Sequence, residues 1–208
     1  MNATTRKGVT VRTEGLRERK KLDTRRRIEG AALELFEQNG FEATTIDDIT
    51  AAVDIAPRTF FHYYSTKEDV VLADYAARLA RITESLAGRP VDEAPWTALQ
   101  NAFVAVAADY EIERPQLLRR FRIMATTPSV YARSLQLQAG WEDAVAMALT
   151  DRMGLETDRD ITPRLLAAAA LAAMRASLRH WLAGGGTTAL PQQVAHCFER
   201  LASGLVND

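Results

Sequence analysis

The residues best suited to chemistry in this chain stand together in the short segment RTFFHYY, which begins at Arg58. On a helical wheel, Phe60 and Tyr64 fall on one side, while Arg58, Phe61 and His62 fall on the other. A guanidinium group can donate two hydrogen bonds to O6 and N7 of a guanine in the major groove of duplex DNA. An outward face that combines this group with an aromatic ring and an imidazole favours contact with nucleotides over a merely solvated surface.

Neighbouring side chains extend this face. The ring of Phe61 cannot donate a hydrogen bond, but it can touch a thymine methyl group or a sugar. Thr59 and Tyr63 lie on the flanks, where hydroxyl groups can reach phosphates or base edges. Lys67 stands at the start of the next predicted helix, and its ammonium group is expected to meet a phosphate together with backbone N–H groups.

The spacing of caps and helix breakers predicts a helix-turn-helix that carries this face. Thr45 is followed three residues later by Asp48, which is a capping-box pattern and begins a helix over about 46–53. Asp54 and Ile55 are predicted to make the turn. The helix that presents the outward face follows directly.

The flanking elements complete a three-helix unit. Apolar residues at helical spacing predict a first helix over about 17–39, and Gly40 is expected to end it in a left-handed conformation. Pro57 suits the first turn of the outward-facing helix, where its missing N–H costs nothing. Residues 1–16 lack periodicity, so they are expected to form a flexible basic arm ahead of a DNA-binding domain over 17–66.

This stretch resembles the DNA-binding domain of the TetR family of transcriptional regulators over residues from about 24 to 70. The resemblance implies a homodimer of all-helical subunits, each with an N-terminal three-helix DNA domain and a larger C-terminal domain that binds a small ligand and dimerises. It also implies that Thr45, Thr59, His62, Tyr63 and Lys67 stand at DNA-contact positions. The matching residues are Ile28, Ala31, Leu35, Phe36, Gly40, Phe41, Thr44, Thr45, Ile49, Ala51, Ala52, Thr59, Phe60, His62, Tyr63, Tyr64, Lys67 and Glu68.

Three positions depart from the family pattern. Phe61 stands where a tyrosine is usual, which puts one hydroxyl-to-phosphate contact in question. Arg58 stands where glycine or another small residue is common, and it offers an additional group for base readout. Ala56 and Pro57 replace the usual polar start of the helix, and alanine is a poor N-cap.

Composition bounds the rest of the chain. The 208 residues are 47% hydrophobic and 25% charged, which is ordinary for a globular protein, and abundant alanine favours helices. The net charge is −1, yet residues 1–30 carry ten Lys or Arg against four acids, which suits a regulator better than a bulk nucleic-acid coater. A single cysteine, Cys197, no apolar run of about 18 residues and no apolar leader predict a cytoplasmic protein without a membrane span.

Residues 67–208 are predicted to form a second all-helical domain that binds a ligand and dimerises. The sequence holds no Gly-rich phosphate loop, Ser-His-Asp set or metal-ligand spacing, so neither a cofactor nor a metal is expected. Most apolar residues at helical spacing are core, and a subset is expected to line a cavity between helices. The predicted helices cover about 67–87, 95–113, 115–124, 128–152, 163–183 and 191–205.

A basic cluster, Arg119, Arg120 and Arg122, falls in this domain, and one of its members is expected to meet either an anionic ligand head or an acidic side chain. Residues 119–149 resemble the C-terminal domain of a TetR subgroup described as binding acyl-CoA-like ligands. That resemblance implies an amphiphilic, acyl-type effector with an arginine near its polar end. The candidate ligand-binding residues are Phe103, Tyr110, Phe121, Arg122, Tyr131 and Trp141.

The last two predicted helices are expected to form the dimer interface. A wide face of small residues allows close helix approach, and a helix pair from each subunit gives a four-helix bundle about a two-fold axis. The alternative is that this face belongs to the core of a single subunit. The residues assigned to the face are Leu165, Leu166, Ala169, Ala170, Ala173, Met174, Leu178, Trp181, Phe198, Leu201 and Leu205.

The resulting hypothesis is a homodimeric, ligand-responsive transcriptional regulator. It acts as a repressor that leaves a pseudo-palindromic operator in double-stranded DNA when its small-molecule effector binds. Two alternatives stay open. A small helical enzyme with the C-terminal cavity as active site predicts converging titratable residues and turnover, whereas an architectural DNA binder without a sensor predicts weak sequence preference and no ligand effect.

Overall fold

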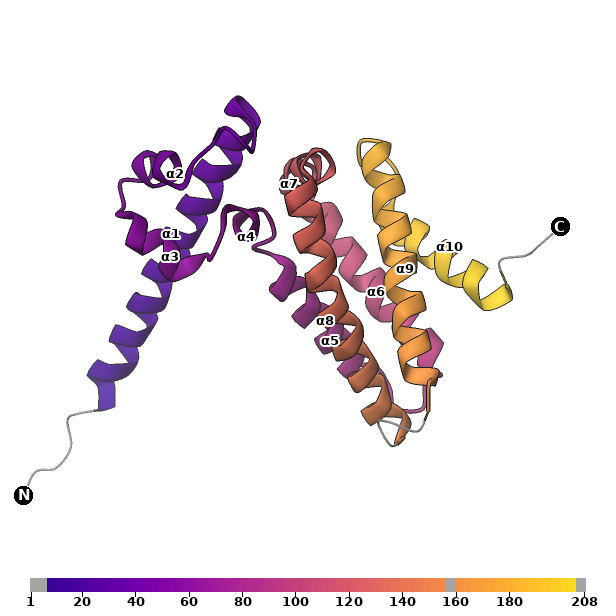
Figure 1. The fold of residues 1–208 in the computed structure, drawn as a ribbon. Helices are drawn as coiled ribbons and strands as arrows, with labels where there is room; N and C mark the ends of the chain where they lie inside the picture. Colours follow the sequence, from indigo (N-terminus) through magenta and orange to yellow (C-terminus); the bar gives the residue numbers. More distant parts are fainter. Residues whose placement is uncertain (1–6, 156–159, 205–208) are drawn as a thin grey trace, which may run out of the picture. The chain divides into compact units, whose positions relative to one another are not determined.

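The computed structural model describes residues 7–155 and 160–204, and every regular element within these ranges is a helix (Figure 1). The all-helical fold class predicted from the sequence is therefore confirmed. The chain divides into two compact units, Met1–Ala73 and Asp74–Asp208. The division falls after the boundary expected at residue 66, because α4 packs on α1.

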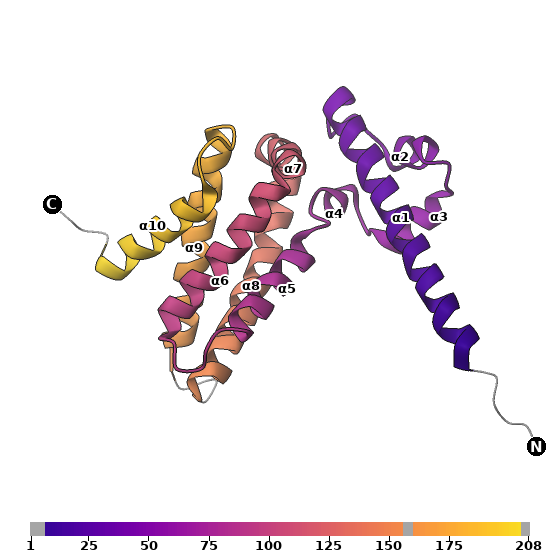
Figure 2. The same cartoon turned by 180° about the vertical axis from the view of Figure 1, so that it is seen from behind.

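The first unit holds the expected helix-turn-helix. Its helix α2 packs on α1, and α3 packs on α2 (Figure 2). The buried side chains of this unit include Ile28, Phe36, Ile49 and Phe60, which share a core that no single helix could form alone. The helices of this unit are α1 (Lys7–Asn39), α2 (Ile46–Ala52), α3 (Pro57–Tyr63) and α4 (Lys67–Val71).

Helix α1 begins at Lys7 instead of near residue 17. The expectation of a flexible arm is therefore wrong for residues 7–16, and residues 1–6 lie outside the described residues. This stretch lacks the apolar stripe used to recognise helices, but it is free of proline. Extending an existing helix adds one hydrogen bond for each residue fixed, so α1 can continue without an apolar face.

Backbone geometry explains why the turns fall where they do. Gly40 ends α1 with φ of +86°, a conformation that costs glycine nothing and other residues about 1 kcal/mol or more. Asp54, at the turn between α2 and α3, also has a positive φ of 53°, and aspartate tolerates the left-handed region better than most residues. Both sites match the turns expected from the sequence.

The helix predicted over 67–87 is broken into two. Val70, Val71 and Leu72 are all buried, and three successive residues of one straight helix cannot share a face. The Ala73 carbonyl accepts a hydrogen bond from Arg25 Nη2 at 2.8 Å. Long-range packing and this side-chain contact therefore decide where α4 stops, and α5 (Tyr75–Ala87) begins after a short turn.

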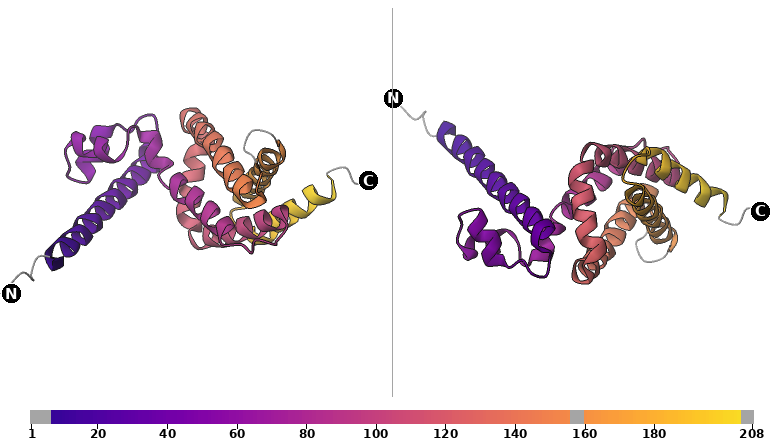
Figure 3. Two further views of the ribbon diagram at one scale, coloured as in Figure 1. Left: turned by 90° about the horizontal axis from the view of Figure 1, so that it is seen from below. Right: turned by 90° about the horizontal axis from the view of Figure 1, so that it is seen from above.

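The second unit is a bundle of six helices within its described part (Figure 3). Helix α6 packs on α5 and α10, and α8 packs on α9. Trp181, Tyr110, Phe103 and Phe198 are its largest fully buried side chains. After α5, its helices are α6 (Pro95–Ile112), α7 (Arg114–Thr126), α8 (Pro128–Met153), α9 (Thr162–Ala183) and α10 (Leu190–Ser203).

Most of the face assigned to dimerisation is core of this same unit. Helix α9 packs against both α8 and α10, so its small-residue stripe is covered within one chain. Leu165, in contrast, is 63% exposed, and Leu205 lies outside the described residues. The dimer assignment is therefore wrong for the buried members of the set, which are Ala170, Ala173, Met174, Leu178, Trp181 and Phe198.

No helix in the two described ranges is both long and apolar enough to cross a bilayer.

Candidate DNA-reading surface and effector cavity

Helix α3 has one buried side and one open side. Phe60 is fully buried and Tyr64, its C-cap, is 5% exposed, whereas Phe61 is 55% exposed. The side chains of Arg58 and His62 are also exposed. The division of faces predicted by the helical wheel is therefore confirmed.

The remaining predicted contact residues surround this open side to different degrees. Thr45 is exposed at the start of α2, while Thr59 and Tyr63 are half-buried on α3. The His62 and Tyr63 rings stand edge to face with their centroids 5.4 Å apart. The helix-turn-helix thus presents hydroxyl, guanidinium, imidazole and aromatic groups close together in sequence, with the buried side of α3 holding them in place.

Tyr64 fixes the end of α3 against α1. Its hydroxyl donates to Glu29 Oε1 at 2.5 Å and accepts from Arg25 Nε at 3.1 Å. Burial and the Glu29 carboxylate raise the pKa of Tyr64, so the phenol keeps its proton at neutral pH. Arg25 Nη2 also holds the Ala73 carbonyl. This network ties the end of α3 to α1 and, through Arg25, to the last residue of the first unit.

The start of α2 carries the predicted capping box. The Thr45 N–H and hydroxyl donate to Asp48 Oδ2 at 2.8 and 2.6 Å, and the Asp48 N–H donates to the Thr45 hydroxyl oxygen at 3.1 Å. The Thr45 hydroxyl and backbone N–H lower the pKa of the Asp48 carboxyl. Each donation favours the charged form of that carboxylate.

Thr45→Ala is expected to destabilise the first unit by about 1 kcal/mol at neutral pH, the usual cost of losing an N-cap. Because the pKa of Asp48 is lower in the folded state, its stabilising contribution is present above the unfolded pKa and is lost as the pH falls through the folded value. The stability difference between wild type and Thr45→Ala should therefore shrink below about pH 4. Denaturant unfolding across that range measures it, and a gap that does not change with pH would contradict the capping assignment.

The ammonium group of Lys67 already makes hydrogen bonds within the protein. It donates to the carbonyl oxygens of Phe41 at 2.8 Å, Thr44 at 3.2 Å and Glu42 at 3.5 Å. It also lies 4.4 Å from the centre of the Phe41 ring. Since an ammonium group has three N–H donors, these carbonyls can use all of them. The predicted phosphate contact would have to compete with this clamp on the turn between α1 and α2.

Lys67→Met is therefore expected to lower the stability of the first unit while leaving the salt dependence of DNA binding unchanged. Lys20→Met serves as the control for stability, because the Lys20 side chain is exposed on α1 and its replacement should change stability little. Unfolding midpoints and the slope of binding against salt concentration measure the two effects. If the slope flattened by about one unit in Lys67→Met, the hypothesis that Lys67 contacts a phosphate would be supported instead.

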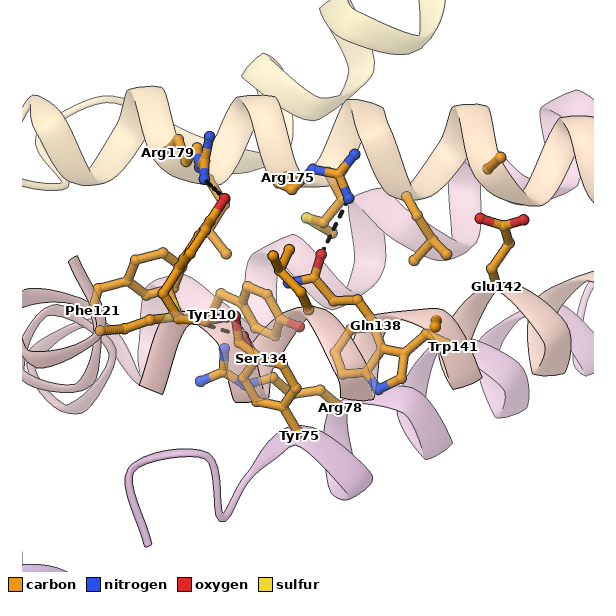
Figure 4. Close-up of a pocket in the computed structure, with 18 residues that line it drawn as sticks. Tyr75, Arg78, Tyr110, Phe121, Ser134, Gln138, Trp141, Glu142, Arg175 and Arg179 are labelled. Atoms are coloured by element: carbon orange, nitrogen blue, oxygen red, sulfur yellow. Dashed lines mark hydrogen bonds between the residues drawn. The ribbon is translucent and has the colours of Figure 1, made fainter. Parts of the chain in front are cut away.

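The second unit encloses a cavity of about 330 Å³ between helices α5 to α9 (Figure 4). Four of the six residues predicted to bind a ligand line it, namely Tyr110, Phe121, Tyr131 and Trp141. They come from three different helices, α6, α7 and α8. Residues far apart in the sequence thus share one wall only because the helices are packed together.

The other two predicted ligand residues do not line this cavity. Phe103 is fully buried in the core, where its ring centroid is 5.7 Å from that of Phe198. Its ring fills the space between packed helices and borders no part of this cavity, so its assignment to the ligand site is wrong. Arg122 is exposed and borders a second hollow of about 540 Å³, which shares Phe121 and Tyr131 with the first.

Three arginines that the sequence analysis did not select line the cavity instead: Arg78, Arg175 and Arg179. Arg175 Nη1 donates to Gln138 Oε1 at 3.1 Å, and Arg179 Nη2 donates to the Tyr131 hydroxyl at 2.6 Å. Figure 4 shows these two contacts running between α9 and α8. The two contacts link α9 to α8 through the exposed side chains of Arg175 and Arg179.

Arg78 lies deeper and is only 4% exposed. It forms an ion pair with Asp74 and lies 4.6 Å from the centre of the Tyr110 ring. A sequence signal for it existed, because Arg78 shares an otherwise apolar helical stripe with Ile82 and Leu86. A charged residue on such a stripe is seldom buried without a partner or a role.

The cavity contains little that could do acid–base chemistry. Burial raises the pKa of Tyr110 to about 12 and also raises the pKa of Tyr75, so both phenols are neutral donors at physiological pH. Among the described side chains that line the cavity, Glu142 is the single carboxylate. In the part of the chain that the structure describes, no three His, Cys, Asp or Glu side chains gather as a metal site would require.

Comparisons with known proteins agree with this geometry. A family profile described as "Bacterial regulatory proteins, tetR family" matches residues 28–73, and one described as "MftR C-terminal domain" matches residues 93–206. The regulator TcmR of Streptomyces glaucescens is 35% identical over 173 residues, which cover 80% of this chain and 76% of TcmR. The chain belongs to the TetR family. The TetR resemblance of its DNA-binding segment is confirmed, and this TetR-family protein is a DNA-binding transcriptional regulator.

Two further relatives extend the likeness over nearly the whole TetR-family chain. The mycofactocin biosynthesis regulator MftR of Mycobacterium tuberculosis, named as putative, is 29% identical over 187 residues, covering 90% of this chain and 93% of MftR. The structure of Thermus thermophilus FadR, a TetR-family repressor in complex with lauroyl-CoA, is 26% identical with a TM-score of 0.59. That alignment covers 88% of this chain and 96% of FadR.

Proposed function

We propose that this protein represses transcription by inserting α3 into the major groove of an operator, and that it leaves the operator when an effector occupies the cavity of the second unit. The observation that carries the proposal is the pair of adjacent aromatics on α3. Phe60 is fully buried and anchors the helix, while Phe61 is exposed beside Arg58 and His62. A helix with one anchored face and one open polar-aromatic face suits a groove reader.

Each proposed contact follows from the chemistry of its side chain. Arg58 is assigned to a guanine edge and Phe61 to a thymine methyl group or sugar. His62 reaches phosphates or base edges, and Thr59 and Tyr63 do so from the flanks. Thr45 is assigned to the backbone at the start of α2, where it is exposed. Lys67 supports this surface through its carbonyl clamp.

The effector is proposed to be a small amphiphile. The cavity combines aromatic walls with the polar ends of Arg175 and Arg179. The bound lauroyl-CoA of the related FadR makes an acyl-type molecule one candidate. Because DNA and effector would favour different conformations, each must weaken the binding of the other by the same factor.

A homodimer is proposed through the outward side of α9. Its exposed or half-exposed positions there are Leu165, Ala169, Ala172 and Ala176, which allow a second helix to approach closely. Two copies of α3 would then meet successive major grooves about 34–36 Å apart. Ala176→Glu should give monomers in sedimentation and weaken operator binding, whereas Ala108→Glu, at an exposed position on α6, should do neither.

The decisive experiment selects duplex fragments of the host genome with the purified full-length protein at moderate ionic strength. The expected result is retention of a few fragments that share a pseudo-palindrome, with two chains bound to each. Native mass spectrometry of protein from its own host should find a small molecule whose addition releases the fragments. Weak retention without sequence preference would favour an architectural binder, and chemical turnover of the molecule would favour an enzyme.

A further inference from the structure

We propose that the effector is an aromatic acid, with its ring against the aromatic wall of the cavity and its anionic group on Arg78. The ligand class rests on the proposed function, in which this cavity receives the effector. The binding site and its chemistry are nevertheless testable without DNA. The cavity volume of about 330 Å³ lies within the range of small-molecule sites and is large enough for an aromatic ring system.

The cavity wall is unusually rich in aromatic rings. Tyr75, Tyr110, Phe121, Tyr131 and Trp141 all line it, from four helices. Tyr75 and Trp141 lie with their ring centroids 5.2 Å apart, and Figure 4 shows the two side chains together on the same side of the cavity. Aromatic rings gain from offset stacking and edge-to-face contacts with other rings, beyond the area they bury. A linear alkyl chain would gain burial but not these contacts.

The buried guanidinium of Arg78 has unused hydrogen-bonding capacity. It is 4% exposed, pairs with Asp74, and yet its Nε has no partner. A buried polar atom left without a partner costs free energy, so an acceptor brought by a ligand would relieve that cost. The Asp74 carboxylate also lies 4.0 Å from Arg120 Nε, so its negative charge is shared between Arg78 and Arg120. An anionic oxygen that reaches Arg78 would form a charge-assisted hydrogen bond.

The polar groups near the opening also favour an anion. Arg175 and Arg179 line the cavity from α9, and both side chains are exposed. The lining carboxylate, Glu142, lies 3.6 Å from Arg164 and is therefore partly neutralised. The charges that an approaching ligand meets are mainly positive, which raises the local concentration of anions.

A matched pair of fluorescent probes tests the proposal on the full-length wild-type protein. The probes are 8-anilino-1-naphthalenesulfonate and N-phenyl-1-naphthylamine, which have the same rings and differ by the sulfonate. We expect the sulfonate probe to bind one site per chain about tenfold more tightly than the neutral probe. Equal affinity, or weaker binding of the sulfonate probe, would overturn the anionic part of the proposal.

Variants locate the anion. Arg78→Met should bring the affinity of the sulfonate probe down to that of the neutral probe, while Arg175→Met should keep most of the difference. The reverse pattern would remove Arg78 from the site. Arg78→Lys, which keeps the charge next to Asp74, provides a second variant if Arg78→Met does not fold, and it should keep part of the preference that the wild-type protein shows.

A linear anion tests the aromatic part. Dodecanoate is expected to displace the bound sulfonate probe only at concentrations more than about tenfold above those of 1-naphthoate, and equal displacement would overturn the aromatic preference. Operator binding is then measured with the same probes. Probe binding without any change in operator affinity would leave this ligand assignment standing and would count against the proposed switching function instead.

Discussion

Phe60→Ala is expected to remove most of the stability of the first unit. The Phe60 side chain is fully buried, and its ring lies 5.8 Å from that of Tyr64 between centroids. Truncating a buried phenylalanine removes its transfer free energy and leaves a cavity, at a cost of about 3–5 kcal/mol. Since whole domains are stable by only about 5–15 kcal/mol, the small first unit should open measurably. Hydrogen exchange resolved by peptide should show the loss of protection in α1 to α4.

The adjacent residue provides the control. Phe61 is 55% exposed, so Phe61→Ala should change the stability of the first unit by no more than about 0.5 kcal/mol. Its effect should fall on DNA binding instead, through the lost contact with a thymine methyl group or sugar. Equal loss of protection in the two variants would mean that α3 is not anchored by one face, and the proposed reading surface would fail with it.

Arg58→Ala is expected to weaken binding to the preferred operator by about 1–3 kcal/mol and to relax specificity at the base pair that Arg58 reads. The side chain is exposed on the open side of α3, so its loss should leave the fold intact. Random duplex DNA should lose much less affinity, because it offers no fixed guanine to the guanidinium. Titration of operator and random fragments at one salt concentration measures both quantities.

Arg58→Lys separates charge from geometry. Lysine keeps the positive charge but lacks the planar guanidinium, which can donate to O6 and N7 of one guanine at the same time. We expect it to retain affinity for random DNA and to lose much of the preference for the operator. An equal loss of affinity for operator and random DNA in Arg58→Ala would contradict base readout and assign Arg58 to the phosphate backbone.

Local signals account for what could be predicted about the first unit. Three of these signals act over only a few residues and can therefore be recognised in the sequence. They are the capping box at Thr45, the turn at Asp54 and the proline at the start of α3. The split between Phe60 and Phe61 also follows from helical periodicity alone. The start of α1 was missed because a polar helix carries no apolar stripe to announce it.

The cavity could be predicted only in part. Tyr110, Phe121, Tyr131 and Trp141 were correctly placed on its wall, since aromatic residues at helical spacing face the interior of a bundle. Periodicity does not say whether an inward ring meets another side chain or an empty space, which is why Phe103 was misplaced. Arg175 and Arg179 were missed because their partners, Gln138 and Tyr131, come from another helix.

The amino-acid sequence by itself determined the family, the all-helical fold and the exposed face of α3, because each follows from patterns of neighbouring residues. Only the tertiary structure decided which backbone carbonyls Lys67 and Arg25 bind and which side of α9 stays exposed. Lys67 reaches the Phe41 carbonyl 26 residues away, and Arg25 reaches the Ala73 carbonyl 48 residues away. Contacts of that length depend on how whole helices pack, and no local pattern specifies which partner a long side chain will meet.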